Sequence, residues 1–318
     1  MAASQILTDL LIFFASLAFI LLSAQFAIRH ASIIASNLGM ARYVVGFIIV
    51  SVISILPETF VAITSAREGI ASFGLATLFG SNVADLTFVI AVILFANGRP
   101  IRVESRVLKN NEFYIAALLI PIIFGLDGRY SRLDGALLLA AGIFFHVWLY
   151  WKHRAAGTPS LKKAGGKKVL RNFAFLLFGM ACVLIGSHFT VQAAVGLAEH
   201  LSISPLLIGL LVVGLGTTIP ELFFSLTALR RHRDSLALGD ILGTVITDAT
   251  AVVGVVALAS PFSFHPRIVF VTGMFMVTAG LTLFYFMRTG KSISRKEGFM
   301  LAALYVLFVC VELAASRF

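Results

Sequence analysis

Long apolar runs, each about as long as a membrane-crossing helix, alternate along the chain with short segments that contain charges, Gly or Pro. A helix needs about 20 apolar residues to cross the hydrocarbon core of a bilayer. By that measure the pattern predicts ten transmembrane helices, at residues 10–28, 43–66, 73–96, 112–126, 133–151, 169–190, 204–229, 236–259, 268–287 and 298–315. The expected fold class is an all-α polytopic membrane protein.

The composition supports this interpretation. Of the 318 residues, 59% are hydrophobic and 13% are charged, and the mean hydropathy is +0.98, whereas soluble domains are roughly 45–50% apolar. The opening residues, MAASQILTDL, lack the Lys and Arg of a secretory signal, so we expect the first apolar run to be a retained helix. Cys182 and Cys310 are far apart and have no metal-ligand spacing, so we expect them to be packing residues.

Basic residues predict the orientation, because cytoplasmic loops of membrane proteins are enriched in Lys and Arg. If both termini lie outside the cell, 20 of the 25 Lys and Arg residues fall on the cytoplasmic side. The exceptions are Arg67, Arg129, Arg132, Arg267 and Arg317. We therefore expect a multi-pass protein of the cell membrane with both termini outside, and the net charge of +10 requires no nucleic-acid partner.

The longest hydrophilic stretch, HRAAGTPSLKKAGGKK, lies between the fifth and sixth predicted helices. Its Gly, Ala, Pro and Lys content is typical of a flexible linker, and its lysines can contact anionic lipid. It divides the chain into a first five-helix unit at 1–152, a cytoplasmic linker at 153–168 and a second five-helix unit at 169–318.

One motif occurs in both units. Glu58 lies in SILPETF and Glu221, 163 positions later, lies in TTIPELF. The same spacing relates a gap-free series of identical pairs, which includes Gly46 and Gly209, Pro57 and Pro220, Thr64 and Thr227, Gly80 and Gly243, Asp85 and Asp248, and Thr87 and Thr250. Because each unit has an odd number of spans, the second copy must cross the membrane in the opposite direction. The predicted fold is two inverted five-helix repeats, an arrangement in which transporters bind substrate near the membrane midplane.

The residues around each motif predict a cation site. A proline removes one helical hydrogen bond, so Pro57 and Pro220 should free the carbonyls of Ile53 and Gly216. The same segments carry carboxylates and hydroxyls, and hard cations such as calcium prefer six to eight oxygen ligands. The candidate oxygen ligands are Glu58, Glu221, Ser54, Thr217, Thr218, Ser81, Asn82, Thr244, Asp85 and Asp248.

Energetics favours bound cations over a structural role for these acids. An acid at the centre of a transmembrane helix costs roughly 2.5–3.5 kcal/mol, so four unpaired carboxylates cost on the order of 10 kcal/mol. No Lys or Arg lies in the central part of any predicted span. Bound ions or protons must supply the missing positive charge.

The segments SILPE…GSNVAD and TTIPE…GTVITD resemble the two alpha repeats of the calcium/cation antiporter superfamily, whose usual form is G-T-S-L-P-E followed by G-S-N or G-N. The resemblance covers essentially the whole chain. It implies that Glu58 and Glu221 are the central calcium ligands, with backbone oxygens near Ser54 and Thr217. It also implies that further residues complete the calcium, sodium or proton sites: Ser51, Gly214, Thr218, Ser81, Thr244, Asp85 and Asp248.

The resemblance implies a monomeric antiporter that exchanges calcium for sodium by alternating access. It implies no enzyme activity and no cofactor. A proton/calcium exchanger is the alternative, because the first motif departs from the superfamily pattern. Ile55 stands where the superfamily commonly has a hydroxyl, and Asp85 replaces a frequent Asn. Ser51 and Ile53 stand where Ala and Gly are usual. A passive cation channel is a further alternative, although acids in a site that empties between turnovers favour obligatory exchange.

The remaining polar residues have simpler interpretations. Asp240 in LGDILG is expected either to be an acid at a helix N-terminus or to support the site from nearby. Glu312 is expected at the membrane interface, and His146 and His188 are expected to be packing or interfacial residues. An intramembrane aspartyl protease also buries two acids, but ALGD at 237–240 lacks the first glycine of a G-x-G-D motif.

Overall fold

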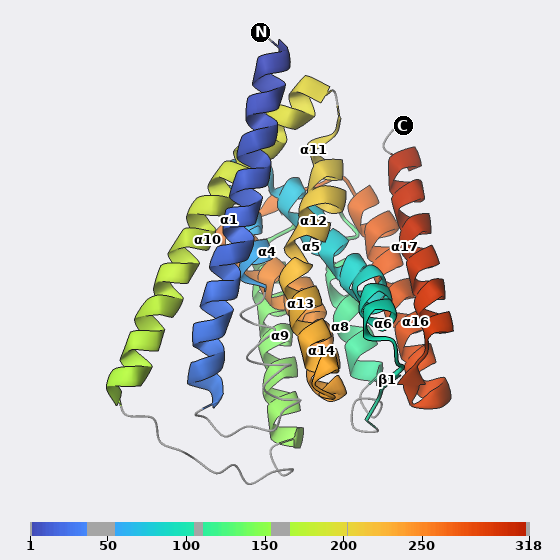
Figure 1. The fold of residues 1–318 in the computed structure, drawn as a ribbon. Coiled ribbons are helices and arrows are strands. Elements are labelled where there is room, and N and C mark those ends of the chain that lie inside the picture. The colour runs from blue at the N-terminus through green and yellow to red at the C-terminus, as the bar shows by residue number, and fades with distance from the viewer. Residues whose placement is uncertain (1, 37–54, 105–110, 154–165, 202, 316–318) are drawn as a thin grey trace.

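The protein is described from a computed structural model that covers residues 2–36, 55–104, 111–153, 166–201 and 203–315. Nearly all of the described chain is helical (Figure 1). The first half contains α1 (Ala2–Ser36), α4 (Leu56–Arg67), α5 (Ala71–Ala84), the π-helix η2 (Asp85–Val89), α6 (Ile90–Asn97), β1 (Ile101–Arg102), α8 (Asn111–Phe124), β2 (Arg129–Tyr130) and α9 (Arg132–His153).

The second half begins with α10 (Gly166–Leu201) and a broken helix. That helix consists of α11 (Pro205–Leu207), η4 (Ile208–Val213), α12 (Gly214–Thr217) and α13 (Ile219–Arg230). There follow α14 (Asp234–Thr247), η5 (Asp248–Val252), α15 (Val253–Ala259), β3 (Phe262–Ser263), η6 (Ile268–Gly273), α16 (Met274–Gly290), β4 (Ser292–Ile293) and α17 (Arg295–Ala315).

The described part of the chain has eight helices that are long and apolar enough to cross a membrane, and a shorter apolar helix at Glu112–Phe124. Together they coincide with nine of the ten predicted spans. Of the second predicted span, 43–66, the structure describes only the end, which is α4. The prediction of a helical multi-pass membrane protein is confirmed, and the count of ten helices stays a prediction.

Corresponding elements of the two halves begin at the spacing of the sequence repeat. The pairs of first residues are 163 positions apart: Leu56 and Ile219, Ala71 and Asp234, Asp85 and Asp248, and Arg132 and Arg295. Equivalent stretches of sequence have therefore formed equivalent helices, including a π-helix at the same place in each half.

Two short strand pairings join the halves. β1 pairs antiparallel with β4, through Ile101 opposite Ile293, and β2 pairs antiparallel with β3, through Tyr130 opposite Phe262. In each pairing one strand comes from the first half and one from the second. Ile101, Ile293 and Tyr130 are fully buried, so the strands also close the apolar interior at their ends of the molecule.

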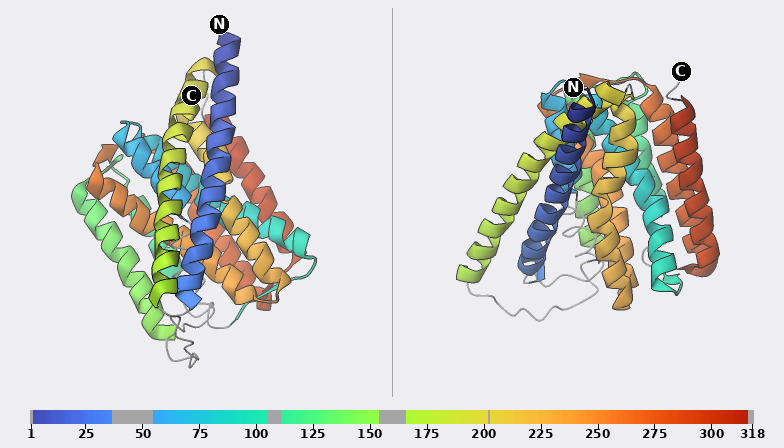
Figure 2. Two further views of the ribbon diagram at one scale, coloured as in Figure 1. Left: turned by 60° about the vertical axis from the view of Figure 1, so that its left-hand side comes forward. Right: turned by 45° about the horizontal axis from the view of Figure 1, so that its top comes forward.

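The long helices α1 and α10 lie side by side (Figures 1 and 2). Glycines on α10 bring them together, because a Cβ atom at Gly186 would lie only 2.7 Å from Cγ1 of Ile20. The Thr190 hydroxyl donates to the Ser16 hydroxyl at 2.8 Å, within the same contact. Small residues that allow close backbone approach are a common basis of helix association in membranes.

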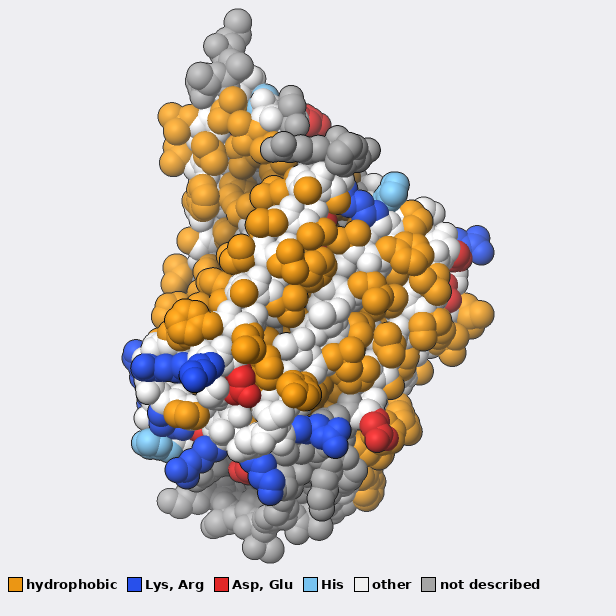
Figure 3. Space-filling model, turned by 90° about the vertical axis from the view of Figure 1, so that its right-hand side faces the viewer, with side chains coloured by type: hydrophobic (Ala, Val, Ile, Leu, Met, Phe, Trp, Pro, Cys, Tyr) orange, Lys and Arg blue, Asp and Glu red, His pale blue; other side chains and the backbone are white. Residues whose placement is uncertain are grey.

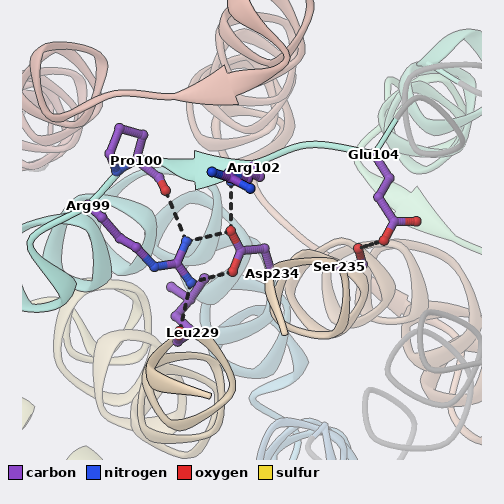
Figure 4. A network of polar contacts seen from close by, with 7 residues as sticks. All are labelled: Arg99, Pro100, Arg102, Glu104, Leu229, Asp234 and Ser235. Atoms are coloured by element: carbon purple, nitrogen blue, oxygen red, sulfur yellow. Dashed lines mark hydrogen bonds and ion pairs between the residues drawn. The ribbon is translucent and has the colours of Figure 1, made fainter. Parts of the chain in front are cut away.

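An ion-pair network joins the first half to the second at the end of the molecule where β1 lies (Figure 4). The Arg99 guanidinium donates to both oxygens of Asp234, at 2.7 and 2.6 Å, and to the Leu229 carbonyl at 2.8 Å. The backbone N–H of Arg102 donates to the same Asp234 carboxylate at 2.8 Å. The hydrogen bonds that Arg99 donates to the Asp234 carboxylate raise the pKa of Arg99 above its usual value.

The surface has the polarity of a membrane protein. Figure 3 shows hydrophobic side chains over the broad middle of one face, and most of its Lys and Arg side chains near the lower end. Large apolar side chains are also exposed along α1 and α10, among them Leu11, Leu22, Phe178 and Ile185. These exposed apolar side chains are suited to contact with lipid tails. The Lys and Arg side chains near the lower end form a basic band that is suited to contact with lipid headgroups.

Candidate functional site

The chain breaks from helical geometry immediately before each Pro-Glu pair. Ile55 and Thr218, at equivalent positions, have φ of −72° and −77° and ψ of 0° and −5°, whereas an α-helix has ψ near −42°. The prolines that follow lie in the first turn of a new helix, where a missing backbone N–H is harmless. Glu58 and Glu221 also lie in these first turns. Each half thus presents a carboxylate at the N-terminus of a buried helix.

The two glutamates are enclosed. Glu58 is 1% exposed and Glu221 is 0% exposed. In the described part of the chain, neither carboxylate oxygen of Glu221 has a hydrogen-bond partner, nor has Oε2 of Glu58. The side chain of Thr217 forms a hydrogen bond with Glu58, so the helix break of the second half contacts the acid of the first.

The aspartates of the second motif are equally buried. Asp85 begins η2 and is 1% exposed, and Asp248 begins η5 and is 0% exposed. Their four carboxylate oxygens have no hydrogen-bond partner among the residues that the structure describes. π-helical turns within α-helices are frequent at functional sites.

The four acids form one electrostatic cluster. The charge of Glu58 acts on Asp85, Glu221 and Asp248, and the charge of Asp85 acts on Glu221 and Asp248. Buried charges without partners are strongly unfavourable, whereas bound cations supply both charge and coordination. The structure therefore buries the four predicted carboxylates within electrostatic range of one another.

Hydroxyl groups border the acids. Thr217 donates to the Gly214 carbonyl at 3.1 Å, Thr218 to the Leu215 carbonyl at 2.8 Å, and Ser81 to the Leu78 carbonyl at 3.0 Å. The bonds of Thr218 and Ser81 use the hydroxyl hydrogen and leave oxygen lone pairs for another partner. Thr244 is fully buried one helical turn before Asp248.

Gly214, one of the predicted site residues, lets two helices pack closely together. A Cβ atom at Gly214 would lie 3.0 Å from the backbone N of Ser81 and 3.1 Å from the Thr77 carbonyl oxygen. The absence of a side chain lets α12 approach α5, and thereby brings the Thr217 and Ser81 segments together.

One detail of the sequence interpretation was wrong. The Gly216 carbonyl was predicted to be left free by Pro220, but it accepts a hydrogen bond from the Thr218 backbone N–H. The chain tightens at the break and so pairs this carbonyl locally. The equivalent carbonyl, of Ile53, and the predicted ligands Ser51 and Ser54 lie outside the described residues.

The acids do not form a compact metal centre by themselves. Within the described ranges, no three His, Cys, Asp or Glu side chains are grouped closely enough to hold a metal ion. A calcium ion that uses a pair of carboxylates together with hydroxyl and carbonyl oxygens does not need such a group.

Three further acids lie in environments that the sequence did not specify. Asp240 does not open its helix, because α14 begins at Asp234, and it is fully buried and interacts electrostatically with Asp85 and Glu221. Glu312, expected at the interface, is 1% exposed and pairs with Arg267 at 3.1 Å. His188, expected to be a packing or interfacial residue, contacts Glu68 at 2.9 Å, so that pair links α10 to the end of α4.

The spacing of Asp240 was a usable signal for the first of these acids. Asp240, Thr244 and Asp248 are four residues apart, and such residues share one face of a helix. Extending that series by one turn from the site residues would have placed Asp240 beside them. The Arg267–Glu312 and His188–Glu68 contacts have no comparable local signal.

The family model of the sodium/calcium exchanger protein matches the chain twice, over residues 8–151 and 171–314. CaxA of Alkalimonas amylolytica, which carries the name of an antiporter, is 32% identical over 295 residues, with 89% of this chain and 92% of CaxA covered. The sodium/calcium exchanger MaX1 of Methanosarcina acetivorans is 24% identical, with 96% of this chain and 99% of MaX1 covered.

Solved structures of the sodium-calcium exchanger NCX_Mj share the fold. One, soaked with sodium and strontium, superposes with a TM-score of 0.70 at 23% identity and covers 96% of this chain and 99% of that chain. The family model spans most of the present chain in two copies, and both copies contain the buried Pro-Glu motif. The chain belongs to the sodium/calcium exchanger protein family.

Proposed function

We propose that the protein exchanges calcium for sodium across the cell membrane, at a site shared by Glu58 and Glu221. The observation that carries the proposal is the group of buried carboxylates at equivalent positions of the two halves, most of whose oxygens lack a described hydrogen-bond partner. Membership of an exchanger family and the name of the MaX1 relative support the choice of ions.

In the proposed site, calcium lies between Glu58 and Glu221 and takes further oxygens from the segments of Ser54 and Thr217. The other predicted residues complete the calcium position or neighbouring monovalent positions: Ser51, Gly214, Thr218, Ser81, Thr244, Asp85 and Asp248. Calcium is cargo here, and the protein performs no chemical step and needs no cofactor.

Exchange follows from the energetics of the emptied site. Four carboxylates in a dry interior cost on the order of 10 kcal/mol without counter-charge. A conformational change that carries the site from one side to the other is therefore accessible when cations fill it, and is disfavoured when it is empty. This dependence couples the outward movement of one ion species to the inward movement of the other.

Proton coupling is the second candidate, and two residues favour it. Ile55, at the first helix break, is 5% exposed and offers no hydroxyl to a sodium ion. Asp85 adds a buried acid whose two oxygens have no described hydrogen-bond partner. A proton that neutralises one acid of the cluster could replace a sodium ion in the exchange cycle.

For the arrangement in the membrane, we propose two inverted five-helix halves, 1–152 and 169–318, joined by a cytoplasmic linker at 153–168. Both termini lie outside the cell, and the protein works as a monomer. The constant spacing of 163 positions between equivalent helix starts and the two matches to the family model support the two halves. The basic band near one end supports the orientation.

The decisive experiment is calcium flux into liposomes that contain the purified protein. A sodium gradient alone should drive calcium uptake, and Glu58→Gln should abolish it. Uptake under a proton gradient, but not under a sodium gradient, would replace sodium by protons as the counter-ion. Calcium flux that is independent of both gradients would instead indicate a channel and refute exchange.

A further inference from the structure

A groove of about 710 Å³ lies between α8 (Asn111–Phe124) and α16 (Met274–Gly290), and none of the buried acids lines it. All of its lining residues come from these two helices. They lie between Glu112 and Leu119 on α8, and between Leu281 and Thr289 on α16, mostly three or four positions apart. Residues with this spacing share one face of a helix, so the groove is formed by one face of each helix.

The two helices run antiparallel and pack closely on the inner side of the groove. A Cβ atom at Gly125, just after α8, would lie 2.9 Å from Cγ2 of Val269, which precedes α16. A Cβ atom at Gly280 would lie 2.7 Å from Cδ1 of Leu118. On the outer side, the small residue Ala116 is exposed and leaves the middle of the groove open. The groove therefore faces the surroundings of the protein and not its interior.

The groove is apolar at one end and charged at the other. Leu119 and Leu281 line the apolar end, whereas Glu112 and Arg288 line the other end and are exposed. Tyr285, which is 65% exposed, lies one turn before Arg288, and tyrosine is enriched where lipid tails meet headgroups. From Leu281 to Arg288 the helix rises about 10 Å, roughly a third of the hydrocarbon core. The groove thus has the polarity and the depth of a lipid within one leaflet.

The two charged residues of the groove do not pair with each other. In the part of the chain that the structure describes, neither Glu112 nor Arg288 forms an ion pair. An anionic headgroup would be attracted by Arg288 but repelled by Glu112, and a cationic headgroup would meet the reverse. A headgroup that carries both charges satisfies both residues.

Headgroup contacts decide which lipid is preferred, because an acyl chain gains no hydrophobic free energy when it moves from bulk lipid into an apolar groove. Arg binds phosphate through two parallel hydrogen bonds, and a primary ammonium donates charge-assisted hydrogen bonds to a carboxylate. A quaternary choline has no hydrogen to donate. The charges of the groove therefore favour ethanolamine over choline as well as over an anionic headgroup.

We propose that the groove binds a phospholipid with an ethanolamine headgroup, with the phosphate at Arg288, the ammonium at Glu112 and an acyl chain along the apolar part. Because α8 belongs to the first half of the chain and α16 to the second, the bound lipid contacts both halves and stabilises their association. The proposal does not depend on calcium exchange.

Lipid titration of the purified protein tests the site. The thermal unfolding midpoint is measured in a nonionic detergent with dioleoyl phosphatidylethanolamine, phosphatidylcholine or phosphatidylglycerol, which share acyl chains and differ in headgroup. A ligand of the folded state raises the midpoint according to its occupancy. We expect the ethanolamine lipid to act at the lowest concentration. Glu112→Gln should raise the required concentration of this lipid at least about fivefold and lower that of the glycerol lipid, since it removes an attraction for the ammonium and a repulsion of the anion.

Arg288→Gln should weaken the response to all three lipids, because each carries a phosphate. Arg230→Gln is the matched control and should respond like wild type. Arg230 is an exposed arginine outside the groove, and it ends α13 next to Leu229, whose carbonyl accepts from Arg99 at the β1 end of the molecule. If Glu112→Gln does not fold, Arg288→Gln decides: an ethanolamine-lipid response at least about fivefold weaker supports the site, and an unchanged response overturns it.

Four other results would overturn the inference. Wild type may not respond first to the ethanolamine lipid, Glu112→Gln may leave the order of the three lipids unchanged, or Arg230→Gln may lose as much as Arg288→Gln. The fourth result concerns a second copy of the chain as the occupant of the groove. Light scattering would reveal it as a lipid-free dimer that Ala116→Trp, which fills the groove, converts to a monomer.

Discussion

Replacing Glu221 with glutamine removes one negative charge from the buried cluster and keeps the volume of the side chain. Glu221 is the more informative of the two glutamates, because both of its oxygens lack a described hydrogen-bond partner, whereas Glu58 has the contact with Thr217. The substitution should therefore affect the ion-free and the calcium-loaded protein in opposite directions.

The expected magnitudes follow from the burial of the site. An unpaired acid at a helix centre costs roughly 2.5–3.5 kcal/mol, so Glu221→Gln should make the ion-free protein more stable by about 2 kcal/mol at alkaline pH, where the cluster carries most charge. Calcium loses one of its two central carboxylates. We expect its Kd to rise at least about a hundredfold, which corresponds to about 2.7 kcal/mol.

Thermal unfolding in detergent, with a chelator and then with increasing CaCl₂, measures both effects, and calcium uptake into liposomes measures the functional loss. Glu104→Gln is a suitable control, because Glu104 is an exposed carboxylate bonded to Ser235 outside the cluster. The reasoning is refuted if Glu221→Gln binds and exchanges calcium like wild type. A lower ion-free stability would contradict the view that the emptied carboxylates repel one another.

Three further outcomes are expected. Ser160→Cys, in a protein whose Cys182 and Cys310 are replaced, should resist a membrane-impermeant thiol reagent added outside intact cells, and rapid labelling would reverse the proposed orientation. Calcium affinity should rise with pH near neutrality. Asp85→Asn should flatten this pH dependence in a calcium-flux assay, because the cluster loses an acid that can take up a proton. An unchanged pH profile would assign Asp85 a structural role. Asp234→Ala should lower the free energy of unfolding by about 2–4 kcal/mol, because it leaves the Arg99 guanidinium partly buried without its carboxylate. A smaller decrease in the free energy of unfolding, measured in detergent, would show that water screens the ion pair.

The apolar runs predicted most helices correctly, because the length of bilayer that a helix must cross sets a strong lower limit on each run. The site acids were also predictable, since identical residues at a fixed spacing in two units must occupy equivalent places. For Asp240 a helix end stayed one of two alternatives because hydropathy locates the limits of a span only to within a few residues, and α14 begins two residues before the predicted start at 236.

Contacts between the halves could not be predicted in the same way. Arg99 and Asp234 are 135 positions apart, and their pairing depends on how the ends of α6, α13 and α14 meet in space. The hydrogen bond from Thr218 to the Gly216 carbonyl depends on a local tightening that the presence of Pro220 alone does not specify. Neither feature produces a periodic pattern along the chain.

The exchange of strands between the halves sets an order for biosynthesis. β1 is complete at Arg102, but its partner β4 begins at Ser292, 190 residues later. At a synthesis rate of roughly 5–20 residues per second, β1 waits on the order of 10–40 seconds for its partner strand. The first half therefore enters the membrane with an unpaired strand, and its acids are enclosed only after the second half arrives. Chains truncated before residue 292 should consequently be substrates for membrane quality-control proteases, even though they contain both Pro-Glu motifs.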